Sequence, residues 1–200
     1  WKMYKFAIPV ASRKADVVRK VIQKAVLMIK MAGIQIKRFH ADQATEFTHG
    51  ILEKWLLDQG IVSTFSAPDD HRANGAAECA VAWNKAKIRA VLVAAGLGEK
   101  YWPFAAHYVT EKVLVEMGVK PVSIYARIPF GANVLAKVRS WNRKNAFTPR
   151  AEKAIWLGPD PRVLHAGLVE DKDGVMTAAT IWTKPEADLP TGRILKLRDE

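Results

Sequence analysis

The 200-residue sequence contains a single cysteine, Cys79, and five histidines that are scattered along the chain. One cysteine excludes an internal disulfide framework. Without paired cysteines and histidines, a structural zinc finger is excluded as well. Any metal ion that this chain binds is therefore expected to have oxygen ligands.

Long apolar segments are also missing. No run approaches the roughly 20 residues that a helix needs to span a bilayer. The N-terminal segment WKMYKFAIPV lacks the order of charged, apolar and small residues that is typical of a signal peptide. We therefore expect a soluble, intracellular protein with no membrane partner.

Acidic residues are few compared with basic ones: 20 Asp and Glu stand against 31 Lys and Arg, which gives a formal net charge of +11. Half of the residues are hydrophobic, which is enough for one large domain plus a small one. The positive charge predicts an anionic partner, either nucleic acid or an acidic membrane surface. Of the two, we expect nucleic acid.

The first 95 residues alternate between strand-like and helix-like patterns. Strands are expected at Tyr4 to Val10, Ile34 to Ala41 and Ile61 to Phe65, and helices at Ser12 to Gly33, Glu46 to Gln59 and Ala76 to Ala95. An exposed loop, SAPDDHRANG, is expected before the last helix. The alternation predicts an α/β fold with a core domain over residues 1–120.

Beyond Pro121 the periodicity becomes strand-like. Short strands are expected at Ala132 to Val138, Lys153 to Leu157, Ala166 to Glu170 and Val175 to Trp182, with Asp173-Gly174 as a hairpin signal. This pattern predicts a small β-rich module over residues 121–183. The Pro-rich, mixed-charge segment 184–200 is expected to be a tail or linker.

Two carboxylates occupy positions that suit a metal site. Asp42, in the stretch HADQATEFTHG, follows an expected strand, and Glu78 lies in the first turn of the long helix. Open α/β sheets place ligand sites at the carboxyl ends of strands. Mg²⁺ prefers one or two carboxylates plus phosphate oxygens, so the pair suits phosphoryl transfer on nucleic acid. The alternative is structural: Asp42 caps the next helix, and Glu78 complements a helix dipole.

Basic residues supply candidate contacts to nucleic acid. Lys85 and Arg89 fall within about 40° of Glu78 on the long helix, and the loop from Lys137 to Lys153 mixes basic residues with aromatic ones. The candidate contacts are Asn74, Lys85, Arg89, Arg139, Arg143 and Lys144. The alternatives are a solvated helix face, a plain turn at Asn74-Gly75 and a solvated loop whose aromatics hold it to the core.

Several segments resemble, in the same order, the integrase core of copia-type retrotransposons. They are HADQATEF, STFSAPDDHRANGAAECA and LGEKYWPFAAHYVTEKVL, followed by Phe130-Gly131 and Trp156-Leu157-Gly158. The resemblance covers roughly residues 1–160. It aligns Asp42 with the family's Asp-Gly-x-Glu-Phe-like segment and Glu78 with its Asn-Gly-x-x-Glu segment, which carry the second and third catalytic carboxylates.

This resemblance implies a ribonuclease-H-like fold, with a mixed sheet flanked by helices. It also implies a polynucleotidyl transferase that uses Mg²⁺ or Mn²⁺, bound by Asp42 and Glu78, to process element DNA ends and join them to target DNA. The implied partner is double-stranded DNA, from element ends and target. The intact protein is expected to be a homo-oligomer in the nucleus or in a cytoplasmic retroelement particle.

The sequence also departs from the family pattern. The family's first catalytic aspartate and its zinc-binding segment have no counterpart here. Asp16 is not a substitute for that aspartate, because it fits an acidic residue in the first turn of a helix. We therefore expect an N-terminally truncated core that does not carry out strand transfer. Gln43-Ala44 and Cys79 replace the usual residues beside the two carboxylates. Two other functions remain open: a catalytically dead DNA-binding remnant, and a ribonuclease-H-type nuclease acting on RNA and DNA hybrids.

Overall fold

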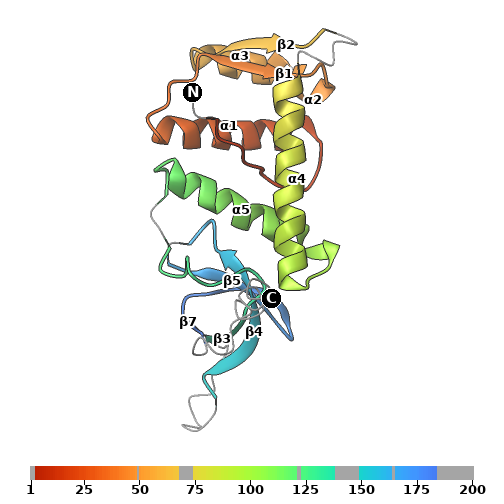
Figure 1. Ribbon diagram of the computed structural model, residues 1–200. Helices are drawn as coiled ribbons and strands as arrows, with labels where there is room; N and C mark the ends of the chain where they lie inside the picture. The colour runs from red at the N-terminus through yellow and green to blue at the C-terminus, as the bar shows by residue number, and fades with distance from the viewer. Residues whose placement is uncertain are drawn as a thin grey trace. The chain divides into compact units, whose positions relative to one another are not determined.

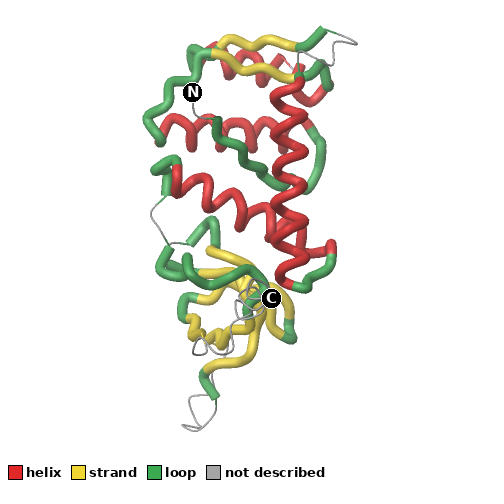
Figure 2. The backbone as a smooth tube through the Cα atoms, in the orientation of Figure 1, coloured by secondary structure: helices red, strands yellow, loops and turns green. Residues whose placement is uncertain are grey.

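A computed structural model describes residues 3–48, 50–67, 74–120, 123–137, 149–163 and 165–183 (Figure 1). Helices and strands both contribute (Figure 2), which confirms the mixed α/β class. The chain forms two compact units, Trp1–Ala86 with Lys112–Pro121 and Lys87–Glu111 with Val122–Glu200. In the described ranges, no helix is long and apolar enough to cross a membrane.

The first unit is built around a pair of parallel strands. Its elements are α1 (Ala15–Met31), β1 (Arg38–Ala41), α2 (Thr45–Thr48), α3 (Gly50–Asp58), β2 (Val62–Phe65) and parts of α4 (Gly75–Ala95) and α5 (Trp102–Glu116). β1 and β2 pair in register from Arg38 with Val62 to Ala41 with Phe65. Parallel strands need a crossover connection, which α2 and α3 provide here.

Two apolar clusters stabilise this unit. The first has buried Val26, Leu52, Leu56 and Ile61, and the partly buried Ile22, Ile36, Phe39 and Trp55 pack against it. The second has buried Val113, Leu114 and Met117, against which Tyr4, Phe6, Met28, Ile29, Ala32, Trp83 and Val119 pack. Since α1 contributes to both clusters, its amphipathic pattern reflects burial on more than one side.

The expected strand from Tyr4 to Val10 is wrong, because residues 3–14 form no helix or strand. Its apolar pattern comes instead from Tyr4 and Phe6, which pack in the second cluster, and Pro9 has no N–H to donate to a ladder. The expected mixed sheet is likewise not found in the described ranges. Parallel pairing is confined to β1 and β2, and the other sheet is antiparallel throughout.

The expected helix from Glu46 to Gln59 corresponds to α2 and α3, which lie on either side of His49, a residue outside the described ranges. The long helix is confirmed almost to the residue, since α4 covers Gly75–Ala95.

The second unit contains a five-stranded antiparallel sheet. Its strands are β3 (Asn133–Lys137), β4 (Ala151–Pro159), β5 (Gly167–Asp171), β6 (Gly174–Ala178) and β7 (Ile181–Thr183), in the spatial order β6-β5-β4-β3-β7. The predicted hairpin is confirmed, because Asp171 pairs with Gly174 across the turn. The expected strand from Val175 to Trp182 is divided into β6 and β7.

Trp156 is the centre of this unit's sheet core. Its side chain is fully buried with Val134, Ala136, Val169 and the other members of one apolar cluster. Tyr125 meets its ring edge-on, with 5.6 Å between ring centroids. Gly167 lies directly against the indole, so that a Cβ atom placed there would be 1.9 Å from a ring carbon. The absence of a side chain at residue 167 is therefore a condition for burying Trp156.

Replacing Gly167 with Ala is expected to lower the free energy of unfolding by about 3 kcal/mol or more, because the rigid indole ring would have to move. Denaturant unfolding followed by tryptophan fluorescence would measure the change. Gly98→Ala is a matched control, because Gly98 has open space around it and no left-handed φ. An equal loss in both variants would contradict this account of the core.

A buried carboxylate holds the connection between β4 and β5. Asp160 is 5% exposed and accepts hydrogen bonds from the Arg162 backbone N–H, at 2.8 Å, and from the Thr177 hydroxyl on β6. Burial acts to raise the pKa of Asp160, but these hydrogen bonds outweigh it and hold the pKa below its ordinary value. A lowered pKa means that the charged form stabilises the fold.

Asp160→Asn is expected to destabilise the protein by about 1–3 kcal/mol at neutral pH, because the Arg162 hydrogen bonds would lose a charged acceptor and the Thr177 hydroxyl would have to accept instead of donate. The ionised carboxylate contributes stability above the ordinary aspartate pKa of about 4, and that contribution is lost as pH falls through the lowered pKa. The difference between the wild type and the variant should therefore shrink in acid. Asp173→Asn, at the exposed hairpin turn, is the control, and a difference that stayed constant with pH would exclude a role for the charge.

Candidate metal and nucleic-acid site

The carboxyl ends of β1 and β2 lie at the same edge of the two-stranded sheet, because the strands are parallel (Figure 1). The ladder continues one step beyond the strands: the Ser66 N–H donates to the Ala41 carbonyl oxygen at 3.0 Å. Asp42 is the next residue of the first strand's chain. This is the edge at which open α/β sheets bind their ligands.

The Asp42 side chain is exposed to solvent. Its Oδ1 accepts one long hydrogen bond, 3.4 Å, from the Ala44 N–H. The first helical hydrogen bonds of α2, from Phe47 and Thr48, go to the Ala44 carbonyl, so Ala44 and not Asp42 occupies the N-cap position. In the described ranges Oδ2 has no hydrogen-bond partner. The helix-capping alternative therefore does not account for this carboxylate.

Glu78 lies in the first turn of α4 and is also exposed. That turn begins at Asn74, whose carbonyl accepts hydrogen bonds from the N–H groups of Ala77, at 2.9 Å, and Glu78, at 3.1 Å. No described residue pairs with the Glu78 carboxylate. Its position near the positive end of the helix dipole agrees with the structural alternative and leaves both oxygens open to a ligand.

His40 is held in place two residues before Asp42. Its Nδ1 lies 2.9 Å from Thr64 Oγ1, and its Nε2 lies 3.4 Å from Ser66 Oγ. The Thr64 hydroxyl also donates to the Phe39 carbonyl at 3.3 Å, so the same side chain contacts both the ring and the backbone of β1. Asp42 follows His40 two residues later, just beyond the end of β1 at Ala41.

Sequence reasoning did not assign a role to His40. Its partners are 24 and 26 residues away, and only the pairing of β1 with β2 brings them together. Lys5 was missed for the same reason: its Nζ lies 3.8 Å from Cys79 Sγ, beside Glu78. The sequence held one local signal for each residue. His40 is a polar side chain two residues before the candidate carboxylate Asp42, and Lys5 is a lysine within an apolar segment.

The predicted DNA contacts have different outcomes. Lys85 and Arg89 are both exposed, one turn apart on α4, whereas Asn74 is half-buried at the N-cap of the same helix. The remaining three, Arg139, Arg143 and Lys144, lie outside the described residues.

The second unit presents a basic and apolar stripe that the sequence pattern did not reveal. The strand register aligns Lys153 of β4, Leu135 of β3 and Trp182 of β7 on one face. Leu135 is 37% exposed and Trp182 is 45% exposed, so this face of the sheet is open to solvent at its β7 edge. Leu135 lies between Lys153 and Trp182, so the stripe has a basic end on β4 and an aromatic end on β7.

Chemically, Asp42 and Glu78 offer hard oxygen donors within one compact unit, as a site for Mg²⁺ requires. Among the residues that the structure describes, no group of three or more His, Cys, Asp or Glu side chains is placed to hold a metal ion. Two carboxylates leave the remaining positions of an octahedral ion to water and phosphate oxygens. No model of a known protein family matches the chain.

Proposed function

We propose that this chain is the core of an integrase-like polynucleotidyl transferase, which binds double-stranded DNA and a divalent cation through Asp42 and Glu78. One observation carries the proposal. The parallel pairing of β1 and β2 puts Asp42 at the carboxyl edge of the sheet, and α4, the next element after β2 in the sequence, bears Glu78. The carboxyl end of a strand is where open α/β sheets bind ligands, and the first turn of a helix favours an acidic side chain.

The proposed fold of the first unit is ribonuclease-H-like. The support is a parallel strand pair joined through helices, with Phe39 of β1 packed against the cluster formed by residues of α1 and α3. The net charge of +11 supports the DNA partner, because phosphate contacts supply most of the affinity of proteins that bind DNA.

In this proposal each residue has a defined task. Asp42 and Glu78 hold Mg²⁺ or Mn²⁺, which when bound stabilises negative charge on the reacting phosphate. Lys85 and Arg89 neutralise backbone phosphates and so position the DNA along α4. The hydrogen bonds of His40 to Thr64 and Ser66 fix the end of β1, and through it the position of Asp42.

A second candidate is a DNA-binding remnant that catalyses nothing. One observation favours it: in the described part of the chain, no group of three or more His, Cys, Asp or Glu side chains is placed to hold a metal ion. The remnant would bind DNA with the same salt dependence, but independently of Mg²⁺ or Mn²⁺. Metal binding therefore separates the two functions.

For DNA binding, replacing Lys85 and Arg89 together with Ala should reduce the slope of log K against log salt by about two, because two phosphate contacts would be lost. Fluorescence anisotropy with a labelled duplex at several salt concentrations would measure the slope. The control is the double variant Lys20→Ala with Lys24→Ala, which removes the same charge from an exposed part of α1. Equal reductions in both variants would show that net charge alone, and not α4, sets the affinity.

For the metal site, Asp42→Asn and Glu78→Gln should each weaken Mn²⁺ binding by at least about tenfold, because each removes a charged ligand. Electron paramagnetic resonance of free Mn²⁺ would report the affinity, with and without duplex DNA. Glu53→Gln, at an exposed acid on α3, is the matched control. Mn²⁺ binding that is unchanged in both site variants would leave only the DNA-binding remnant.

A further inference from the structure

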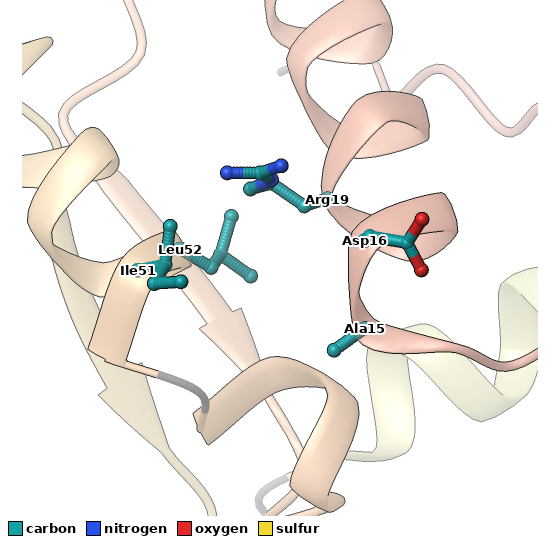
Figure 3. Close-up of a pocket in the computed structure, with 5 residues that line it drawn as sticks. All are labelled: Ala15, Asp16, Arg19, Ile51 and Leu52. Atoms are coloured by element: carbon teal, nitrogen blue, oxygen red, sulfur yellow. The ribbon is translucent and has the colours of Figure 1, made fainter.

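A cavity of about 190 Å³ lies beside Arg19 of α1 in the first unit (Figure 3). The Nε atom of Arg19 is buried where a ligand in the cavity does not reach it, so the cavity indicates no ligand. The second unit offers a different kind of surface, the stripe formed by Lys153, Leu135 and Trp182 on one face of its sheet. This stripe is open to solvent and has no part in the proposed metal site.

Only part of this sheet face is covered by the rest of the second unit. Ile155, two residues after Lys153 on the same face of β4, packs against the apolar cluster that includes Tyr101. The cover ends before the stripe, since Trp182 is 45% exposed and Leu135 is 37% exposed. Tryptophan has a large, flat and apolar ring system, and it is enriched at binding interfaces for that reason.

Two exposed lysines flank the apolar part of the stripe. Lys153 lies opposite Leu135, and Lys137 follows Leu135 by two residues on the same face of β3. The Lys137 N–H donates to the Thr180 carbonyl, so Lys137 is a diagonal neighbour of Trp182 on one side and of Lys153 on the other. Diagonal neighbours in a sheet are about 7–8 Å apart, a distance that long side chains span.

The acid next to Lys153 in the sequence does not neutralise this face. Glu152 lies opposite the buried Ala136, so it belongs to the other face of the sheet. Its carboxylate pairs there with Lys172 at 3.3 Å. The positive charges of Lys137 and Lys153 therefore face solvent beside an exposed indole ring.

We propose that Trp182, Lys137 and Lys153 form a site for single-stranded DNA, separate from the proposed metal site. One base stacks on the Trp182 ring, and the two lysines contact neighbouring phosphates. Proteins that bind single strands combine stacking on aromatic side chains with basic residues along the backbone. Duplex DNA keeps its bases paired and stacked, so it cannot use the Trp182 ring in this way. The choice of DNA over RNA rests on the proposed function, whereas the stacking site itself does not.

Fluorescence anisotropy of the full chain with a labelled oligothymidylate of about 10 nucleotides, in EDTA, tests the role of Trp182. The control ligand is an abasic oligomer of the same length, which keeps the phosphates. The chain should bind oligothymidylate at least about fivefold more tightly than the abasic oligomer, and Trp182→Ala should remove this preference. Trp182→Phe keeps an aromatic ring and should retain most of it. Trp102→Ala is the matched control, because Trp102 is 44% exposed in the same unit, and it should leave the preference unchanged.

The salt dependence of oligothymidylate binding tests the lysines. Lys137→Ala together with Lys153→Ala should reduce the slope of log K against log salt by about 1.4, because each phosphate contact to a single strand contributes about 0.7. Lys20→Ala together with Lys24→Ala removes the same charge from an exposed part of α1 and should leave the slope nearly unchanged.

Equal losses in Trp182→Ala and Trp102→Ala, or equal affinity for oligothymidylate and the abasic oligomer, would overturn the proposal. So would equal slopes in the two double variants, or tighter binding of oligouridylate than of oligothymidylate. EDTA removes divalent cations and the ligands are single strands, so none of these readouts depends on Asp42, Glu78 or duplex DNA. Failure here is therefore distinguishable from failure of the proposed function.

Discussion

Parallel pairing of two short strands is the constraint on which the candidate site depends. An isolated pair of strands is marginal in water, so β1 and β2 persist only because Leu52, Leu56 and Ile61 are almost completely buried beside them. Parallel strands also cannot be joined by a tight turn, and the helical crossover both connects them and covers them. The same pairing that buries the apolar residues places the ends of both strands, with Asp42 and Ser66, at one edge.

The hydrogen bonds at that edge show how a scaffold fixes a functional side chain. His40 is exposed, yet both ring nitrogens meet hydroxyl groups of the β2 chain, one before and one after the end of the strand. Ser66 is 7% exposed and also extends the backbone ladder to Ala41. These contacts hold the strand end rigid, whereas the Asp42 carboxylate just beyond it has only one long hydrogen bond. Such a carboxylate can exchange that bond for a ligand at little cost.

Local sequence patterns predicted the secondary structure well where composition or turn residues alone determine it. The helix from Ala76 to Ala95 and the hairpin at Asp173-Gly174 were correct because their signals are local: alanine-rich sequence in one case and turn chemistry in the other. The segment from Tyr4 to Val10 was misjudged because side-chain burial against helices can imitate the alternation of a strand. Pro9 was the local signal against a strand, because proline has no N–H to donate to a ladder.

The candidate site was predictable only in part, for a similar reason. Asp42 and Glu78 were identified from their positions at a strand end and a helix start, and both are exposed there. The partners of His40, the neighbour of Cys79 and the alignment of Lys153 with Leu135 and Trp182 all depend on register between distant segments. Sequence periodicity carries none of this information.

Anomalous diffraction from crystals of this protein grown with Mn²⁺ and a short DNA duplex would show whether Asp42 and Glu78 share a metal ion. We expect an anomalous peak within coordination distance, about 2.2 Å, of carboxylate oxygens from both Asp42 and Glu78, with a DNA phosphate oxygen completing the shell. A Mn²⁺ ion bound elsewhere, or bound by only one of the two carboxylates while DNA occupies another face, would contradict it.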